Sequence, residues 1–171
     1  TTGWAAKGSS TVSRITSPTF IGLGAGQVAT TAVAGDGAKF DYTFTASTQY
    51  TLSVYVRLSS GSMTTFVLGR QDVSGTDIDC LTGKTVGTNW VRYACTFTTG
   101  ATITSSNIYI KQSDASARNI YVDGVQLETG AYASPYNPGG KISLNGVIAG
   151  PTAFENSISI GSVQGVSDRS L

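Results

Sequence analysis

Apolar and polar residues alternate with a period of two in short runs along most of the chain, a pattern typical of β-strands that bury one face. The clearest run is YTLSVYVRLS at residues 50–59. Its inward positions are predicted to be Tyr50, Leu52, Val54, Val56 and Leu58. The positions between them, including Tyr55 and Arg57, are predicted to face outward.

Further runs of this kind are separated by turns rich in Gly, Ser, Thr and Asn. They cover residues 27–33, 39–45, 63–72, 76–81, 90–98 and 107–112 and the first part of 119–137, and residues 1–19 indicate one or two edge strands. In the last run the alternation changes phase at Asp123-Gly124, which predicts a strand with a β-bulge. About ten short strands without an amphipathic helical pattern predict an all-β, two-sheet antiparallel sandwich with negligible helix.

Composition limits what such a sandwich can do. A chain of 171 residues is long enough for one domain with a sizeable core. Charged residues make up only 12% of it and the formal net charge is +1, so we expect neither nucleic acid nor an anionic membrane surface as a partner. No apolar run is long enough to cross a bilayer and no cleavable leader is evident, so no membrane insertion is expected.

The residue types present also argue against catalysis. The chain contains no histidine, which excludes Ser-His-Asp and Cys-His catalysis and His-ligated metals. A glycosidase needs two carboxylates facing each other across the sugar bond, and the sequence has only two glutamates, Glu128 and Glu155. The glycine-rich stretch FIGLGAG at residues 20–26 matches no phosphate-binding fingerprint, so we interpret it as a turn. We therefore predict a protein that is not an enzyme.

Three stretches resemble a known family. They are NIYVDGVQLETGAYASPYN at residues 119–137, YTLSVYVR at 50–57 and WVRYACTFT at 90–98. They are similar to strands of the β-jelly-roll carbohydrate-binding modules (the family 4, 9 and 22 type), and the first is close to the lectin-like modules of phage tail and fibre proteins. The resemblance implies a jelly-roll module over residues 1–138. The C-terminal extension at 139–171 is then an extra edge hairpin, a linker or an oligomer contact.

The outward positions carry groups that suit a sugar. A sugar ring has apolar C–H faces and a rim of hydroxyls, which favour flat aromatic rings and forked polar groups. The predicted carbohydrate-binding residues are Tyr55, Arg57, Tyr121, Gln126, Arg92, Trp90 and Tyr109, together with Arg70, Gln71 and Asp72 at the end of a strand. The resemblance implies stacking roles for Tyr55 and Tyr121. The alternatives are that Trp90 packs over the edge of the sandwich, that Tyr109 lies on the opposite sheet, and that the arginines are solvated surface charges.

The resemblance also implies a structural calcium ion at Asp123. Calcium takes six to eight oxygen ligands, so one carboxylate needs others beside it. Residues 1–13 contain no Asp or Glu, which leaves Asp36 and Asp41 as possible partners. The alternative is that Asp123 caps the bulge.

Cys80 and Cys95 lie about equally far from the turn near Gly87, so their strands can place them opposite each other. A disulfide there stabilises the fold by about 3 kcal/mol through loop closure. Two buried free cysteines are the alternative. A disulfide fits an oxidising, extracellular setting.

The function predicted from these features is non-catalytic binding of an oligo- or polysaccharide through one concave sheet. The setting is extracellular or virion-associated, with the module appended to a hydrolase or a viral structural protein. The alternative is a structural or assembly domain of a phage tail or surface protein, in which the exposed aromatics contact protein.

Overall fold

The computed structural model describes residues 3–136, 141–142 and 148–149, which fall into two compact units, Thr1–Ala133 and Ser134–Leu171. The described part of the first unit is all β and contains ten strands and no helix. None of the described residues forms a helix long and apolar enough to cross a membrane. The first unit ends five residues before the boundary at 138 that the sequence predicts.

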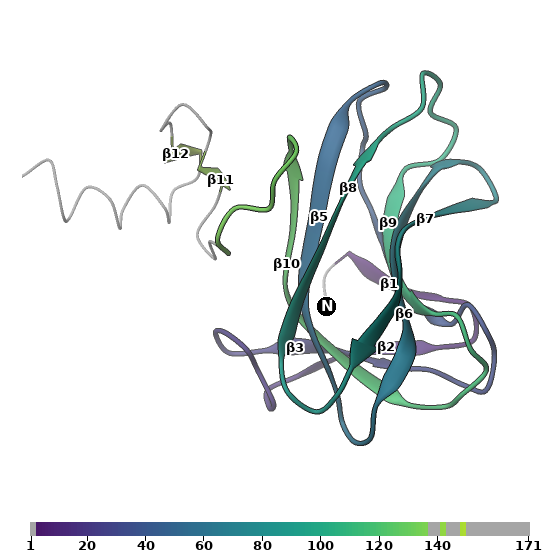
Figure 1. Cartoon of the computed structure of the whole chain (residues 1–171), viewed down its shortest axis with the longest axis vertical. Coiled ribbons are helices and arrows are strands. Elements are labelled where there is room, and N and C mark those ends of the chain that lie inside the picture. Colours follow the sequence, from purple (N-terminus) through teal and green to yellow (C-terminus); the bar gives the residue numbers. More distant parts are fainter. Residues whose placement is uncertain (1–2, 137–140, 143–147, 150–171) are drawn as a thin grey trace, which may run out of the picture. The chain divides into compact units, whose positions relative to one another are not determined.

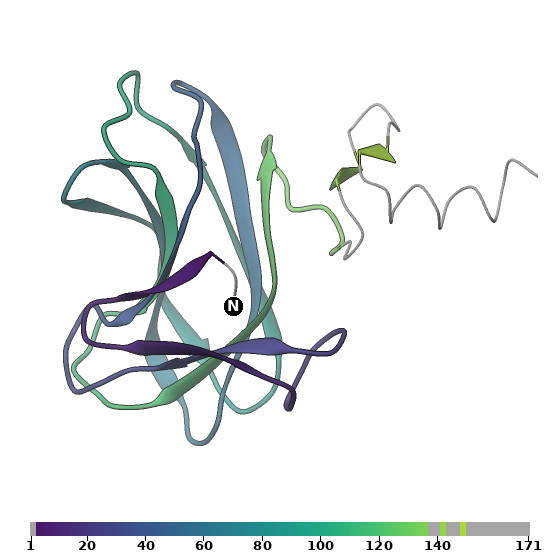
Figure 2. The same cartoon turned by 180° about the vertical axis from the view of Figure 1, so that it is seen from behind.

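The first unit is a sandwich of two five-stranded antiparallel sheets that face each other (Figures 1 and 2). One sheet has the order β1-β4-β9-β6-β7, with bounds Trp4–Lys7, Gly37–Asp41, Asn107–Gln112, Met63–Val73 and Thr76–Val86. The other has the order β2-β3-β10-β5-β8, with bounds Thr11–Ile15, Ala25–Ala29, Asn119–Thr129, Gln49–Leu58 and Val91–Thr98. The predicted all-β, two-sheet antiparallel sandwich is confirmed.

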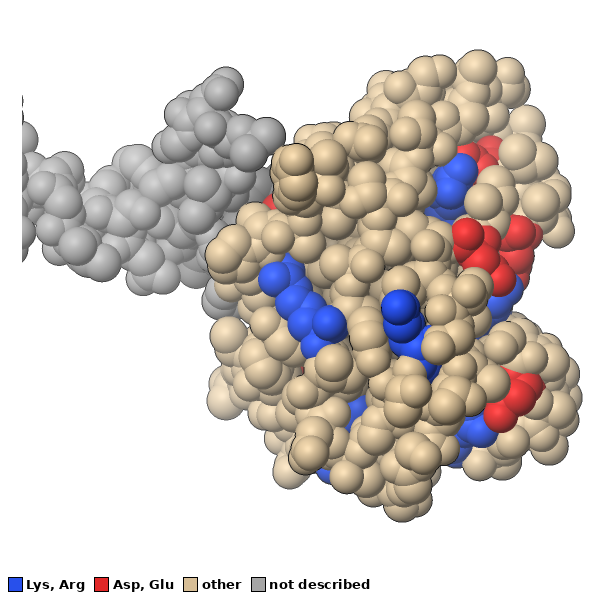
Figure 3. Space-filling model, in the orientation of Figure 1, with Lys and Arg blue, Asp and Glu red and all other residues tan. Residues whose placement is uncertain are grey.

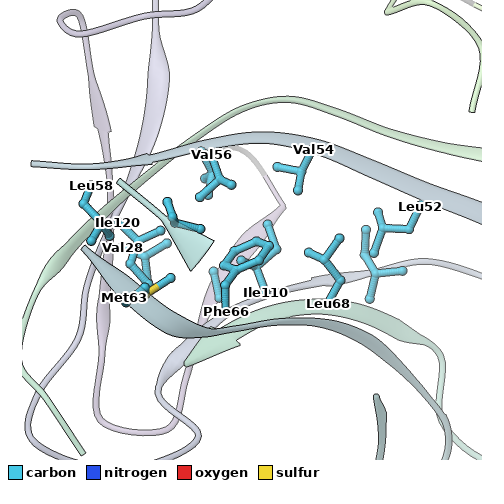
Figure 4. Packing of buried hydrophobic residues seen from close by; sticks show 14 of the residues in the cluster. Val28, Leu52, Val54, Val56, Leu58, Met63, Phe66, Leu68, Ile110 and Ile120 are labelled. Carbon is cyan, nitrogen blue, oxygen red and sulfur yellow. The ribbon is translucent and has the colours of Figure 1, made fainter. Parts of the chain in front are cut away.

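The core lies between the sheets and is built from the alternating apolar residues of their strands. All five predicted inward residues of β5 have exposed fractions of 2% or less. Figure 4 shows Val54 and Val56 of this strand pointing toward the layer that carries Phe66, Leu68 and Ile110. Because a strand places alternate side chains on opposite faces, burying this row forces Tyr55 and Arg57 to the outside of the sandwich.

The bulge in β10 lies where the sequence predicts it. The pairing of β10 with β5 slips between Asp123 and Gln126, and Gly124 has a φ of 54°, in the left-handed region that glycine adopts at no steric cost. Before the bulge Ile120 and Val122 are buried, and after it Val125 and Leu127 pack on the core. One strand therefore keeps an apolar inner face on both sides of the bulge.

A disulfide joins the two sheets at one edge. Cys80 of β7 and Cys95 of β8 are bonded, with their Cα atoms 5.8 Å apart. These strands are the last ones in their respective sheets. The cross-link therefore connects the layers through their edge strands, in addition to the core contacts.

Strand ends differ from the sequence prediction at several places, and β4 covers Gly37–Asp41 rather than residues 39–45. The sequence predicts a turn at residues 83–89, but β7 extends into this segment as far as Val86, because its backbone keeps pairing with β6. β3 covers Ala25–Ala29 rather than residues 27–33.

In the second unit, β11 (Lys141–Ile142) and β12 (Ile148–Ala149) form a short antiparallel pair. The rest of the predicted extension at 139–171 lies outside the described residues.

Candidate functional site

The outer face of the β2-β3-β10-β5-β8 sheet collects most of the aromatic and basic residues that the sequence predicts for binding. In the pairing of neighbouring strands Tyr121 lies opposite Arg57, and Arg92 lies opposite Tyr55. We call this surface the aromatic face. Its members are Phe20, Tyr55, Arg57, Trp90, Arg92 and Tyr121. Tyr55 and Tyr121 thus lie on one side of one sheet, as a shared binding surface requires.

Arg57 is the centre of this face. Its guanidinium carbon lies 6.0 Å from the centre of the Trp90 ring and 6.0 Å from the centre of the Tyr121 ring, within the range of cation–π attraction. Its Nε donates to the carbonyl of Leu58 at 3.3 Å, and it forms no ion pair with any described carboxylate. The fork of the guanidinium is therefore held between two rings without an acidic partner.

A stacked pair of rings lies beside Arg57. Phe20 lies on Tyr55 with ring centres 3.6 Å apart and planes 13° from parallel, and the centres of the Phe20 and Trp90 rings are 6.2 Å apart in an edge-to-face arrangement. The Arg92 guanidinium lies 5.6 Å from the centre of the Tyr55 ring and donates to the Ser53 hydroxyl at 2.9 Å. Sequence reasoning missed Phe20, because it belongs to the turn segment 16–24 and the alternation rule places only strand residues.

Asp123 holds the segment that carries Phe20. Its Oδ2 accepts from the backbone N–H groups of Phe20 at 2.8 Å and Ile21 at 3.0 Å, and its Oδ1 accepts from Gly124 N–H at 2.8 Å. The carboxylate thus caps the bulge, as the alternative interpretation predicts, and also ties a distant loop to β10.

Calcium at Asp123 stays a prediction, and these contacts fit it poorly. Each carboxylate oxygen already accepts from the backbone, and no group of three or more Cys, Asp or Glu side chains gathers among the described residues. Asp36, one of the two possible partners, is fully buried and accepts from Ser9 and Thr31.

Past the bulge the same outer face becomes small and polar. Gln126 lies opposite Ser53, so it shares the sheet surface with Tyr55 and Arg57 but lies beyond the bulge. The next row contains Thr51, whose hydroxyl contacts Thr96 at 2.9 Å and the Gly130 carbonyl at 2.8 Å. The aromatic rings therefore occupy one end of this face, and beyond the bulge small polar residues follow, of which Ser53 and Thr51 are buried.

Four predicted residues belong to the opposite sheet instead, and two of them contribute to its outer surface. Tyr109 and Gln71 belong to β9 and β6, and their side chains take part in a set of ion pairs on the outer surface of that sheet. We call this surface the ionic face. It contains Lys7, Gln71, Asp77, Asp79, Asn107, Tyr109 and Lys111. In Figure 3 most of the acidic atoms in view lie on the side of the sandwich where β7 and β9 run.

Tyr109 is fully buried within the ionic face. The ammonium groups of Lys7 and Lys111 lie 4.9 and 4.8 Å from the centre of its ring, and its hydroxyl donates to Asp79 at 2.6 Å. The ring lies against Gly69, where an added Cβ would come within 2.3 Å of it. Burial and the neighbouring Asp79 raise the pKa of this phenol. Tyr109 is therefore on the opposite sheet, as the alternative interpretation predicts, with no ring face available for stacking.

Arg70 and Asp72 lie on neither outer face. They form an ion pair at 3.0 Å in which Asp72 is almost completely buried, and Arg70 also donates to the Thr98 carbonyl at 2.9 Å. Asp72 accepts from the Gly100 N–H at 2.8 Å. Burial alone would raise the pKa of Asp72, but the bonds from Gly100 and Arg70 outweigh it and hold that pKa below its usual value. The pair ties β6 to the chain after β8 and thus links the sheets.

The expectation that the ten predicted residues serve one concave sheet is therefore wrong for Tyr109, Arg70, Gln71 and Asp72, which belong to the opposite sheet. The remaining six share the outer side of one sheet. Their roles in binding stay predictions.

Comparison with solved structures gives close matches to the sandwich. A family 22 carbohydrate-binding module of Clostridium thermocellum Xyn10B is 26% identical with a TM-score of 0.67, over 78% of this chain and 89% of that one. A domain described as the xylan-binding domain from CBM 22 is 27% identical with a TM-score of 0.60, over 71% of this chain and 83% of that one. A two-module xylanase fragment from Clostridium thermocellum, with CBM22-1 and GH10 modules, has 20% identity and a TM-score of 0.63, over 78% of this chain and 27% of that one.

Sequence comparison gives the family directly. No curated protein matches the sequence. A family model described as a carbohydrate binding domain matches residues 1–117, which is more than half of the chain. With the two-sheet sandwich and the modules that share it, this match shows that the chain belongs to that family of carbohydrate-binding domains.

Proposed function

We propose that this domain binds a polysaccharide through the aromatic face and performs no chemistry on it. The observation that carries the proposal is the position of Arg57, whose guanidinium lies between the rings of Trp90 and Tyr121 without an acidic partner among the described residues. The rings offer flat apolar surface to the C–H faces of a sugar, and the fork offers paired donors to its hydroxyls. Gln126 lies on the same side of the sheet beyond the bulge, where its amide extends the surface toward a longer chain.

Xylan is the first polysaccharide to test. Both structural neighbours at 26–27% identity are family 22 modules, and one is described as a xylan-binding domain. The two-module relative pairs its module with a GH10 xylanase module, so we propose a similar arrangement here, with the domain holding an attached hydrolase near its substrate. The Cys80–Cys95 disulfide supports an extracellular setting, since such bonds persist in oxidising compartments.

The test is affinity gel electrophoresis followed by titration calorimetry with soluble xylan, mannan, β-glucan and host-surface glycans. We expect retardation by at least one of them. We expect Tyr121→Ala to weaken binding about tenfold or more, since a lost stacking contact of about 1.4 kcal/mol corresponds to a factor of ten. Val73→Ala is the control, because Val73 is 43% exposed and belongs to β6 of the opposite sheet.

Two outcomes would contradict the proposal. One is equal binding by wild type and Tyr121→Ala, which would place the sugar elsewhere. The other is no binding to any glycan together with a trimer or larger assembly in sedimentation, which would favour the structural or assembly role.

A further inference from the structure

We propose that Phe20, rather than Tyr55, is the ring on which a sugar stacks at this point of the aromatic face, and that Asp123 is the residue that positions it. The inference rests on the proposed function, because it concerns how that same surface meets its glycan. It assigns a binding role to a loop residue outside the β-strands and a positioning role to a carboxylate otherwise predicted as a metal ligand.

One face of the Tyr55 ring is already occupied. Phe20 covers it with ring centres 3.6 Å apart and planes 13° from parallel. A sugar that stacks on an aromatic ring needs the same contact distance, so Phe20 fills the place that a sugar on this face of Tyr55 would take. The Arg92 guanidinium also approaches the Tyr55 ring, with its carbon 5.6 Å from the ring centre.

The Phe20 ring is held in this position by its backbone. Both Phe20 and Ile21 donate their N–H groups to Oδ2 of Asp123, at 2.8 and 3.0 Å. Hydrogen bonds to a charged acceptor are stronger than neutral ones. Asp123 lies opposite Tyr55 on the neighbouring strand, so the carboxylate that grips the loop stands beside the ring that Phe20 covers.

The far end of the loop has its own attachment. Arg14 donates to the Leu23 carbonyl at 3.0 Å, and its guanidinium packs against Gly24, where an added Cβ would come within 2.5 Å of Nε. Contacts on both sides of the segment therefore restrain Phe20, and a ring fixed before binding costs little ordering entropy when a ligand arrives.

Phe20 also presents apolar surface at the right place. It is 42% exposed although it stacks on Tyr55, and its ring packs edge-to-face with that of Trp90, which flanks Arg57. Trp90 thus connects Phe20 to the Arg57 guanidinium, whose other aromatic neighbour is Tyr121. A pyranose chain crossing this surface would contact the ring of Phe20, which separates it from the covered face of the Tyr55 ring.

The experiment compares Phe20→Ala, Phe20→Trp and Leu23→Ala with wild type, by calorimetry on the polysaccharide that wild type binds best. We expect Phe20→Ala to weaken binding about tenfold and Phe20→Trp to retain it within about twofold. Leu23→Ala is the matched control and should bind as wild type does, because Leu23 lies in the same loop and is 86% exposed.

The inference is overturned if Phe20→Ala binds as tightly as wild type or more tightly, since Phe20 would then be a cover over Tyr55. In that case Tyr121→Ala would still weaken binding, so the proposed function would stand. Failure of wild type to bind any glycan would instead remove the proposed function itself.

The positioning role of Asp123 has a separate readout. Stacking shifts the NMR signals of the Tyr55 ring protons upfield through the ring current of Phe20. We expect Asp123→Ala to reduce this shift and weaken binding severalfold, and Phe20→Leu to abolish the shift. If the shift and the affinity both survive in Asp123→Ala, the carboxylate does not position Phe20. If Asp123→Ala does not fold, the Phe20 variants decide the proposal.

Discussion

The two outer surfaces of the sandwich contain similar residue types and use them in opposite ways. On the ionic face Lys7 and Lys111 cover the ring of Tyr109 and pair with Asp77 and Asp79, so cations, ring and carboxylates satisfy each other. On the aromatic face Arg57 lies between two rings and pairs with no described carboxylate.

The difference shows that a tyrosine beside a basic residue is not by itself a binding site. Where acidic partners are within reach, the cluster is closed and stabilises the sheet, as around Tyr109. Where the acid is committed elsewhere, as Asp123 is to the Phe20 loop, the Arg57 guanidinium has no described acidic partner, and we propose that it and the Tyr121 ring bind the ligand.

The largest expected contrast is between two tyrosine truncations. Tyr109→Ala removes a fully buried ring, so we expect it to lower the free energy of unfolding by about 3–5 kcal/mol. Tyr121→Ala removes a half-buried ring from an outer surface, and we expect less than about 1 kcal/mol. Urea unfolding of both variants measures the difference. Similar losses of stability would show that the two faces are built alike.

A smaller effect concerns the link between the sheets. Replacing both cysteines by Cys80→Ser and Cys95→Ser removes a cross-link between residues 15 apart, and we expect a loss of about 3 kcal/mol. Because the bond joins edge strands at the rim, the glycan affinity of the remaining folded protein should stay within about twofold of wild type. A selective loss of affinity would mean that the disulfide shapes the aromatic face directly. Mass measured with and without reductant shows first whether the bond is formed.

The ionic face also predicts how stability depends on pH. Burial alone would raise the pKa of Asp77, but hydrogen bonds from Lys7, Lys111 and Gln71 outweigh it and lower that pKa. A carboxyl whose folded pKa lies below its unfolded value of about 3.9 stabilises the fold above that pH, and this contribution is lost as the pH falls through the folded pKa.

The pKa values of three other carboxyl groups are lowered for the same reason. Burial alone would raise them, but hydrogen bonds to the carboxylates outweigh it in Asp36, Asp72 and Asp114. We therefore expect the free energy of unfolding to fall below about pH 4. Asp77→Asn should make that fall shallower, whereas Arg57→Ala should leave its slope unchanged. Urea unfolding at a series of pH values checks this, and an unchanged slope in Asp77→Asn would refute the role given to Asp77.

The smallest expected effect is that of chelation. Because the Asp123 oxygens already accept three backbone N–H groups, we expect EDTA to leave the melting temperature unchanged. A drop of several degrees that added calcium restores would establish the structural ion that the family resemblance predicts.

The sequence by itself determined which residues face the core. Alternation along β5 predicts its five buried apolar residues, although Thr51 and Ser53, predicted to face outward, are buried too, and the phase change at Asp123-Gly124 predicts the bulge. The sequence predicts the Cys80–Cys95 disulfide less firmly. The alternation does not show whether both side chains point to the same place, so free cysteines are also compatible with it, and the structure has the disulfide. These features are local, since a strand needs only its own side-chain pattern to decide which face is buried.

The tertiary structure alone decided which sheet each outward residue joins. Tyr55 and Tyr109 have the same outward pattern in sequence, but β5 pairs with β10 and β8 whereas β9 pairs with β4 and β6, so the two rings lie on opposite sides of the sandwich. Phe20 stacks on Tyr55, and its backbone N–H donates to Asp123, which is 103 residues away in sequence. Alternation specifies inside or outside, whereas the choice of strand partner depends on packing among segments far apart in the chain, and that choice places the aromatic face.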